Sequence, residues 1–201
     1  MANNGTIDTL KTAINKRFGL AKPSRFYVEF TLPGKVGSAS DMADLGLFCQ
    51  SATMPTRTIE TTDYATIRQG YKVPNGYSNE PITCTFLLGA DYFPKTLFDK
   101  WISLTVDPVT YRIKYAADYC SDIRIYQLDD MLNRIYGVQL IDAFPTTLNP
   151  IELNMGNTDQ VHLLNVTFAY HDVFILPKTG GAKIGPDDLQ DKATNPIPGS
   201  K

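Results

Sequence analysis

The stretch that decides the fold class runs from residue 82 to residue 104, ITCTFLLGADYFPKTLFDKWISL. Its first seven residues place apolar side chains at every second position, the period of a half-buried β-strand. Beyond Asp91, Pro94 suits the first turn of a helix, and one apolar residue recurs per turn until Pro108: Phe93, Leu97, Trp101 and Leu104. The sequence therefore predicts a strand at 82–88 and a helix at 94–105.

The two-residue period continues on both sides of this stretch. Phe26, Val28, Phe30 and Leu32 share one face of a strand. Residues 33–44, rich in Gly, Ser and Asp, are predicted to form a loop, and further strands are predicted at 45–53, 57–62, 123–128, 134–143 and 161–174. We expect one mainly β body with antiparallel strands, and a core that includes Phe86, Leu97, Trp101 and Phe168.

The chain divides into three parts. Residues 1–25 form an N-terminal helix and arm, in which Ile7, Leu10, Ile14 and Phe18 recur at helical spacing over 7–18. Residues 26–176 form the β domain. Residues 177–201 are rich in Pro and Gly and poor in large apolar groups, so we expect a flexible tail there.

Residues 64–81 differ from the other β segments. Tyr64, Tyr71 and Tyr77 lie here among Gly70, Pro74 and the Asn75-Gly76 pair. Asn-Gly is a turn signal, and tyrosine offers a large amphipathic contact surface. This segment is predicted to be a long exposed hairpin or loop.

Charge is unevenly distributed along the chain. The first 25 residues carry a local charge of +4, whereas residues 26–176 hold 10 basic and 17 acidic side chains, a net charge of −7. Such a body does not form a basic cleft for nucleic acid. The chain begins without a secretory signal pattern and has no run of about 18 apolar residues, so we expect a protein made in the cytosol, with no membrane partner.

The histidines, the cysteines and one glycine-rich segment are the candidates for catalytic or metal-binding chemistry in this sequence. His162 and His171 are nine residues apart, which places them on opposite faces of a regular strand. Cys49, Cys84 and Cys120 fit neither a disulfide scaffold nor a zinc knuckle, and the 179–183 segment lacks phosphate-loop spacing. We expect no catalytic residue, no cofactor and no metal site.

Five short segments occur in a recognisable order. They are residues 21–29 (AKPSRFYVE), 48–55 (FCQSATMP), 97–101 (LFDKW), 136–145 (YGVQLIDAFP) and 166–170 (VTFAY). In this order they resemble the T-even-type tail tube protein family of contractile-tailed bacteriophages, over about residues 7–172. The resemblance implies a two-sheet sandwich with a flanking helix, hexameric rings, and stacking of the rings into a tube through which the genome passes. The tube proteins of type VI secretion systems look like distant relatives in fold.

The same resemblance implies the setting. The protein would be a structural component of the virion tail, assembled in the host cytoplasm, and not an enzyme. Its partners would be further copies of itself, the tail sheath protein, the baseplate hub and the tail terminator, and DNA would pass without specific binding.

Two alternatives remain open. The segment Asp107-Pro108-Val109-Thr110 also resembles baseplate tube initiators of the same fold, which form the first rings. A small cytosolic hydrolase or binding module is the alternative from a different class.

Two sets of residues are expected to serve assembly and passage of the genome. Ring stacking is expected to use the tyrosines of the exposed segment and the basic N-terminal region: Lys16, Arg17, Lys22, Tyr64, Tyr71 and Tyr77. The channel wall is expected to draw on acids in or beside the strands, with Glu29, Glu60, Asp63, Asp142 and Asp172 as candidates. Rings are expected to close by pairing of edge strands between neighbours.

Overall fold

A computed structural model describes residues 7–16, 20–65, 70–154, 156 and 160–176. The fold is mainly β, and every strand pair is antiparallel. The strands are β1 (Phe26–Phe30), β2 (Cys49–Ala52), β3 (Arg57–Ala65), β4 (Gly70–Asn79), β5 (Ile82–Leu87), β6 (Ser121–Leu128), β7 (Arg134–Leu148), β8 (Leu163–Ala169) and β9 (Asp172–Leu176). The helices are α1 (Ile7–Lys16), α2 (Ala39–Phe48), α3 (Phe93–Thr105) and α4 (Ala116–Tyr119).

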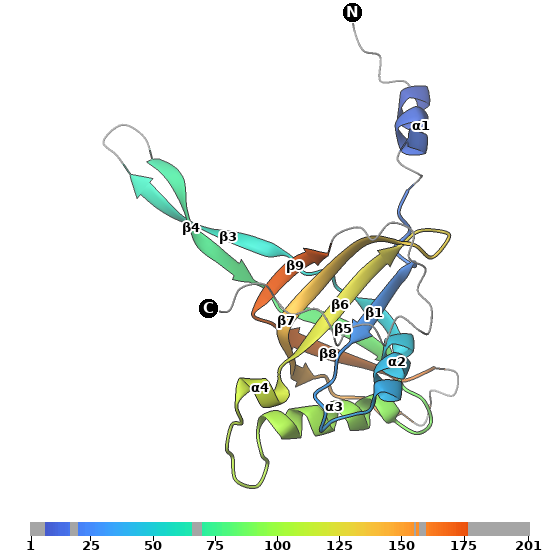
Figure 1. Cartoon of the computed structure of the whole chain (residues 1–201), viewed down its shortest axis with the longest axis vertical. Coiled ribbons are helices and arrows are strands. Elements are labelled where there is room, and N and C mark those ends of the chain that lie inside the picture. Colours follow the sequence, from blue (N-terminus) through green and yellow to red (C-terminus); the bar gives the residue numbers. More distant parts are fainter. Residues whose placement is uncertain (1–6, 17–19, 66–69, 155, 157–159, 177–201) are drawn as a thin grey trace, which may run out of the picture.

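Strand β7 joins the two halves of the main sheet, whose order is β1-β6-β7-β8-β5-β2 with β9 also on β7 (Figure 1). The first part of β7 pairs with β6 and β9, and its end, Phe144–Leu148, pairs with β8. Between these parts Asp142 has a φ of 53°, and the register with β8 shifts after Pro145. A bulge of this kind bends a strand and so lets one sheet fold over itself.

The two halves of the sheet face each other across an aromatic core. The Phe30 ring on β1 lies 5.6 Å from the Phe86 ring on β5 and 6.1 Å from the Phe168 ring on β8. These side chains come from opposite ends of the strand order, so β1 must pack over β5 and β8. Both halves direct their apolar face inward, as the two-residue period requires.

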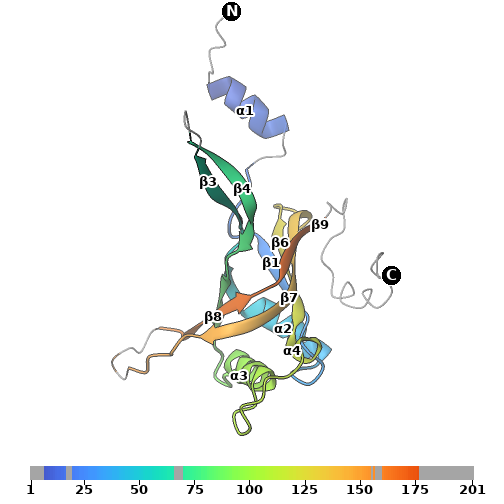
Figure 2. The same ribbon diagram turned by 90° about the vertical axis from the view of Figure 1, so that its left-hand side faces the viewer.

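Helix α3 closes one end of this core (Figure 2). Phe98 lies 5.0 Å from Phe86, ring centre to ring centre, and is stacked on Trp101. Trp101 is 0% exposed, and its indole Nε1 donates a hydrogen bond to the Tyr119 carbonyl of α4, at 2.7 Å. All four residues expected in the core are buried: Phe86, Leu97, Trp101 and Phe168.

Residues 39–48 form a helix, which corrects the prediction of a loop at 33–44 and a strand from residue 45. Ser38 and Asp41 make a capping box at the start of α2, with the Ser38 hydroxyl accepting from the Asp41 amide. Gly46 lies so close to β1 that an added Cβ would be 2.5 Å from the Val28 carbonyl oxygen. Only 49–52 of the predicted strand is extended, as β2.

Two further boundaries differ from the prediction. The expected strand at 161–174 is divided into β8 and β9, because the chain turns at Tyr170-His171 and the His171 amide bonds the Ile141 carbonyl. The short helix α4 was not predicted. Helix α1 covers 7–16 of the expected 7–18, and Phe18, like the expected tail at 177–201, lies outside the described residues.

Candidate assembly surfaces

The most prominent surface feature is the two-stranded sheet formed by β3 and β4, hereafter the hairpin. It extends away from the main sheet in both views (Figures 1 and 2). At about 3.3 Å per residue, its strands of 9 and 10 residues reach roughly 30 Å. Four large apolar side chains on it are 54–65% exposed: Ile59, Tyr64, Tyr71 and Tyr77.

Both faces of the hairpin carry these exposed groups. Ile59 is paired with Tyr77, and Tyr64 with Tyr71, whose rings lie 5.4 Å apart. Five positions separate Ile59 from Tyr64 in β3, and an odd spacing along a strand places the two pairs on opposite faces. The hairpin of a single subunit thus exposes large apolar side chains on both of its faces, among polar and charged ones, and such exposure is typical of an interaction surface.

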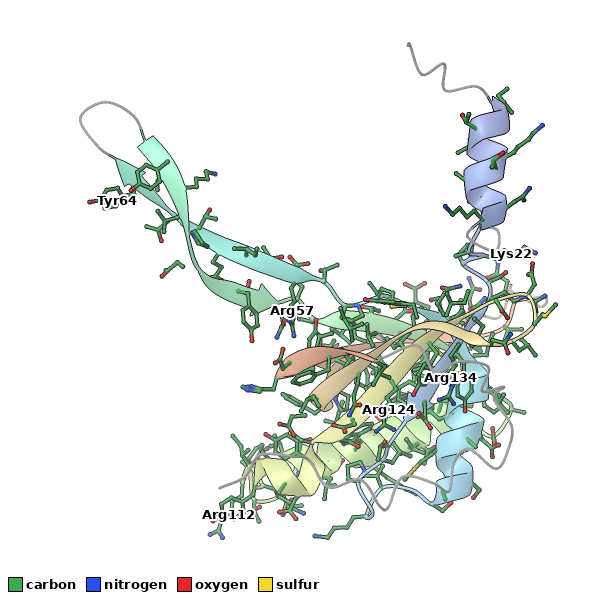
Figure 3. The ribbon with its side chains drawn as sticks, turned by 45° about the horizontal axis from the view of Figure 1, so that its top comes forward. Lys22, Arg57, Tyr64, Arg112, Arg124 and Arg134 are labelled. Carbon is green, nitrogen blue, oxygen red and sulfur yellow. The ribbon has the colours of Figure 1, made fainter. Side chains whose placement is uncertain are left out.

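The base of the hairpin is bonded to the body at two points. Arg57 forms an ion pair with Asp172 and donates to the Val173 carbonyl, and the Asn79 amide donates to the His171 carbonyl at 2.8 Å. The Arg57 guanidinium also lies over the Tyr77 ring, 5.2 Å from its centre. These contacts hold the base of the hairpin against the turn between β8 and β9; Figure 3 shows Arg57 at this base and Tyr64 toward the far end of the hairpin.

Open sheet edges are the second feature. Within the described residues, β1, β2 and β9 each pair with a strand on one side only. Strand β9 also exposes Phe174 and Ile175, two neighbouring residues that point to opposite faces. Unpaired edges with exposed apolar groups favour strand pairing between chains.

Helix α1 stands apart from the sheet in both ribbon views. Ile7 and Leu10 of its apolar stripe are exposed, as is Lys16 at its last turn. Arg17 lies outside the described residues. Lys22, expected to face the next ring, forms a solvent-exposed ion pair with Asp130 of its own β6–β7 turn, Nζ to Oδ1 2.8 Å.

Two of the five candidate channel acids make contacts within the subunit. Glu29 is only 7% exposed, because Arg124 on the neighbouring strand lies 3.6 Å from it and the Tyr126 hydroxyl donates to it at 3.4 Å. Asp172 is occupied by Arg57 and by the Val173 amide. Neither carboxylate is a freely solvated group.

The other three acids are exposed but are not gathered together. Glu60 and Asp63 lie on the hairpin, and Asp142 lies at the bend of β7. Burial raises the pKa of the nearby Cys120 thiol, and the charge of Asp142 raises it further. The expected acids therefore occupy separate parts of the subunit.

One exposed segment was missed by the sequence analysis: residues 106–115, hereafter the α3–α4 loop. Val109, Tyr111, Ile113 and Tyr115 are 74–85% exposed, and Arg112 and Lys114 alternate with them. The alternation of apolar and cationic residues was the available signal. Asp107-Pro108 marks the end of a helix and belongs to the segment that resembles tube initiators, but neither interpretation predicts that the residues after it are exposed.

The described residues offer little chemistry of another kind. No group of three or more His, Cys, Asp and Glu side chains within them could hold a metal ion. No helix in this part of the chain is long and apolar enough to cross a membrane. The pKa of the Cys84 thiol lies well above its ordinary value, because the thiol is hydrogen-bonded to the Cys49 side chain and is buried; both cysteines are free.

Several solved structures have an architecture similar to that of this chain. A chain of the anti-feeding prophage (AFP) baseplate has a TM-score of 0.59 and 14% identity, covering 80% of this chain and 97% of its own. Two chains from an extracellular contractile injection system (PVC) are also similar. The chain from the extended sheath-tube complex has a TM-score of 0.58 and 17% identity, covering 85% of this chain and 99% of its own. The chain from the extended sheath/tube terminator has a TM-score of 0.57 and 17% identity, covering 79% of this chain and 97% of its own.

These identities support the fold alone, and comparison with curated proteins gives no match. The family model described as phage tail tube protein matches residues 21–175, which include the hairpin and all of the main sheet except Leu176, the last residue of β9. The chain therefore belongs to the phage tail tube protein family.

Proposed function

We propose that this chain is the subunit of an inner tail tube, in which hexameric rings stack to form the conduit for DNA ejection. The observation that carries the proposal is the hairpin, which projects roughly 30 Å from the body with apolar groups exposed on both faces. A monomer gains nothing from such an element, whereas a stack of rings buries it at each step.

Lateral closure of a ring follows from the sheet edges. The β1, β2 and β9 edges offer unpaired backbone groups within the described part of the chain, and pairing with an edge of the next subunit satisfies them. A head-to-tail contact of this type forms a closed ring when the rotation that relates neighbouring subunits is a whole fraction of 360°. Closure into a ring would pair one edge of each subunit with an edge of its neighbour.

The assembled tube would meet other tail proteins at its outside and its ends. A tail sheath, a baseplate hub and a tail terminator are the partners we propose, within a virion tail assembled in the host cytoplasm. The similar chains occur in a baseplate, a sheath-tube complex and a tube terminator, which supports these settings. A structural role without catalysis is part of the proposal.

A baseplate tube initiator is the second candidate. The similar baseplate chain and the similar sheath-tube chain have nearly equal TM-scores, 0.59 and 0.58, so this likeness supports both roles. An initiator would form one ring and nucleate a different subunit, whereas a tube subunit would extend its own rings.

Negative-stain electron microscopy of the purified chain tests the proposal. A tube subunit gives rings and long hollow tubes, an initiator gives single rings, and an enzyme or binding module gives monomers. Deletion of residues 68–79 should leave folded subunits or rings that do not polymerise. Normal tubes from this deletion would contradict a stacking role for the hairpin.

A further inference from the structure

The Asn75-Gly76 pair is a turn signal that does not lie at a turn. Strands β3 and β4 are in register as far as Ala65 opposite Gly70, so the pair lies inside β4. Glycine in the interior of a strand weakens the strand and often marks a bulge. The pair is therefore a weak point of β4 and not the turn of the hairpin.

Strand β4 carries a bulge at this pair. Glu60 of β3 is opposite Gly76, and the next pair along the ladder is Thr61 with Pro74. Asn75, between Pro74 and Gly76, has no opposite residue. A bulge disrupts the ladder locally, and a proline has no N–H to donate to it. Residues 74–76 thus interrupt the hydrogen bonding between the two strands.

Little packing holds the backbone of the pair in place. Asn75 and Gly76 are exposed, and nothing lies within 4 Å of a Cβ added at Gly76. Among the described residues, β3 and β4 pair only with each other, and a two-stranded sheet of this kind is marginally stable alone. Segments with few buried contacts open locally at low free-energy cost. The backbone of the pair can therefore leave the strand conformation while the body stays folded.

An asparagine next to a mobile backbone is open to an intramolecular reaction. The nitrogen of the following residue attacks the side-chain carbonyl carbon, and glycine hinders this approach least because it has no Cβ. At this pair the Gly76 nitrogen would bond to Cγ of Asn75 and the bond between Cγ and Nδ2 would break. Ammonia would leave with the proton of the Gly76 nitrogen. The product is a five-membered succinimide ring.

Water then opens the succinimide ring at one of its two carbonyl carbons. Attack at Cγ restores the ordinary backbone and leaves aspartate, whereas attack at the backbone carbon leaves isoaspartate, in which the chain runs through Cβ and Cγ. Either product carries a new negative charge. Isoaspartate also lengthens β4 by one backbone atom, which shifts the pairing register beyond the bulge. Tyr71 would then no longer be opposite Tyr64.

We propose that Asn75 is a spontaneous deamidation site of the unassembled subunit, and that the isoaspartate product is excluded from tubes. The first part depends on the bulge, the exposure and the Asn-Gly chemistry. The second part rests on the proposed function, because a hairpin that has lost its register presents Tyr64 and Tyr71 differently to a neighbouring ring. Burial of the hairpin in a tube would shield the pair from water and hold it in the strand, so assembly would stop the reaction.

Peptide mass spectrometry of the full chain tests the first part. Dilute wild-type subunits are incubated at mildly alkaline pH, which favours loss of the proton from the attacking nitrogen. Asn75 should be converted to aspartate and isoaspartate, which chromatography of the peptides separates. Asn79, which is followed by Glu80, should stay intact and is the internal control.

Two results of this measurement would overturn the inference. Asn4 belongs to a second Asn-Gly pair, outside the described residues, and serves as a reference for the chemistry. An intact Asn75 in a sample whose Asn4 has reacted would show that the hairpin protects its own pair. Aspartate without isoaspartate would show that the reaction does not pass through a succinimide.

Gly76→Ala is the matched variant. It should fold with unchanged circular dichroism, because nothing lies within 4 Å of the added Cβ. The methyl group hinders the attack of the backbone nitrogen, so the variant should retain Asn75 under conditions in which most of the wild type has reacted. Equal modification of the two chains would overturn the inference.

Sedimentation of tubes tests the second part. Tubes grown from partly modified wild-type subunits should pellet with Asn75 intact, and isoaspartate should be enriched in the supernatant. Finished tubes should keep Asn75 during the same incubation. Equal isoaspartate in pellet and supernatant would overturn the exclusion from tubes. A wild-type chain that forms no rings would overturn the proposed function, whereas modification of Asn75 would still be measured in the free chain.

Discussion

The Arg57 guanidinium, at the first residue of β3, bonds the Asp172 carboxylate at the first residue of β9, with 2.7 Å between Nη2 and Oδ1. The side chains are 47% and 23% exposed, so solvent screens the pair and its contribution to folding is small. Its geometric effect is larger, because Arg57 also reaches the Val173 carbonyl and the Tyr77 ring. The pair couples the direction of the hairpin to the main sheet.

Arg57→Ala should therefore impair assembly far more than folding. We expect a loss of unfolding free energy below about 1 kcal/mol and a marked loss of tubes, because the hairpin loses its fixed direction. Urea unfolding and electron microscopy measure the two effects. Asp172→Asn removes the same ion pair from the other side and should act similarly. Normal tubes from both variants would show that the pair does not orient the hairpin.

Trp101→Ala should lower the unfolding free energy by roughly 3–5 kcal/mol, because the side chain is fully buried and its loss leaves a cavity. The Tyr119 carbonyl would also lose its donor. Trp101→Phe keeps most of the volume and should cost less. Since Trp101 is the sole tryptophan, native fluorescence should be blue-shifted. An emission maximum typical of water-exposed indole would contradict the described packing.

Gly46→Ala has two opposing effects on stability: it raises helix propensity within α2, and it introduces a close contact with β1. Alanine favours a helix interior by about 1 kcal/mol over glycine. The added methyl would meet the Val28 carbonyl oxygen at 2.5 Å, and overpacking of this kind costs roughly 1–3 kcal/mol. We expect net destabilisation in urea unfolding. Gly34→Ala is the control, because nothing lies within 4 Å of its added Cβ, and it should change stability by less than about 0.5 kcal/mol. A stabilised Gly46→Ala would mean that α2 and β1 are less closely packed.

Much of the fold was predictable because one face of most strands is buried. A period of two identifies such strands in the sequence, and the prolines and apolar stripe near Trp101 identify α3. Helix α2 was missed because its capping box, Ser38 and Asp41, lies in a stretch whose composition is that of a loop. Propensity does not report the close approach of Gly46 to β1, which is a tertiary contact.

The surfaces were less predictable than the core. Exposure of the hairpin tyrosines followed from the local sequence. The burial of Glu29 did not, because it depends on Arg124 standing opposite it, a consequence of the register between β1 and β6. The ion pair of Lys22 with Asp130 likewise joins residues 108 positions apart. The pattern of a single sequence does not show which distant residues will pair in this way.

The α3–α4 loop should respond to acid. Hydrogen bonds from the Val109 amide and the Thr110 hydroxyl hold the pKa of Asp107 below its usual value. A depressed pKa in the folded state contributes stability above the unfolded-state pKa, near 3.9, and this contribution is lost as the pH falls through the folded-state pKa. Asp107→Asn should therefore lower the urea unfolding midpoint at pH 6. The difference between the midpoints at pH 6 and pH 3 should be smaller in this variant than in the wild type. An unchanged difference would show that Asp107 does not contribute.

Passage of DNA through the proposed tube would require that the channel wall not hold phosphates. Each Lys or Arg that neutralises a phosphate releases counterions and adds salt-dependent affinity. The body between residues 26 and 176 has a net charge of −7. Two of its arginines are also engaged within the sheet, with Arg124 3.6 Å from Glu29 and Arg134 over the Tyr126 ring at 4.2 Å. Such cations are poorly available to a passing duplex.

Purified tubes should therefore fail to shift duplex DNA in an electrophoretic mobility assay at about 0.15 M salt, because a channel wall drawn from this net-negative body repels phosphates more than it attracts them. Lowering the salt by tenfold should give at most weak retention. Asp142→Lys adds one exposed cation per subunit at the bend of β7, and it should raise DNA retention if that bend lines the channel. Tight, salt-sensitive binding by wild-type tubes would show that a surface open to DNA is basic, and that the acidic body does not set the properties of the channel.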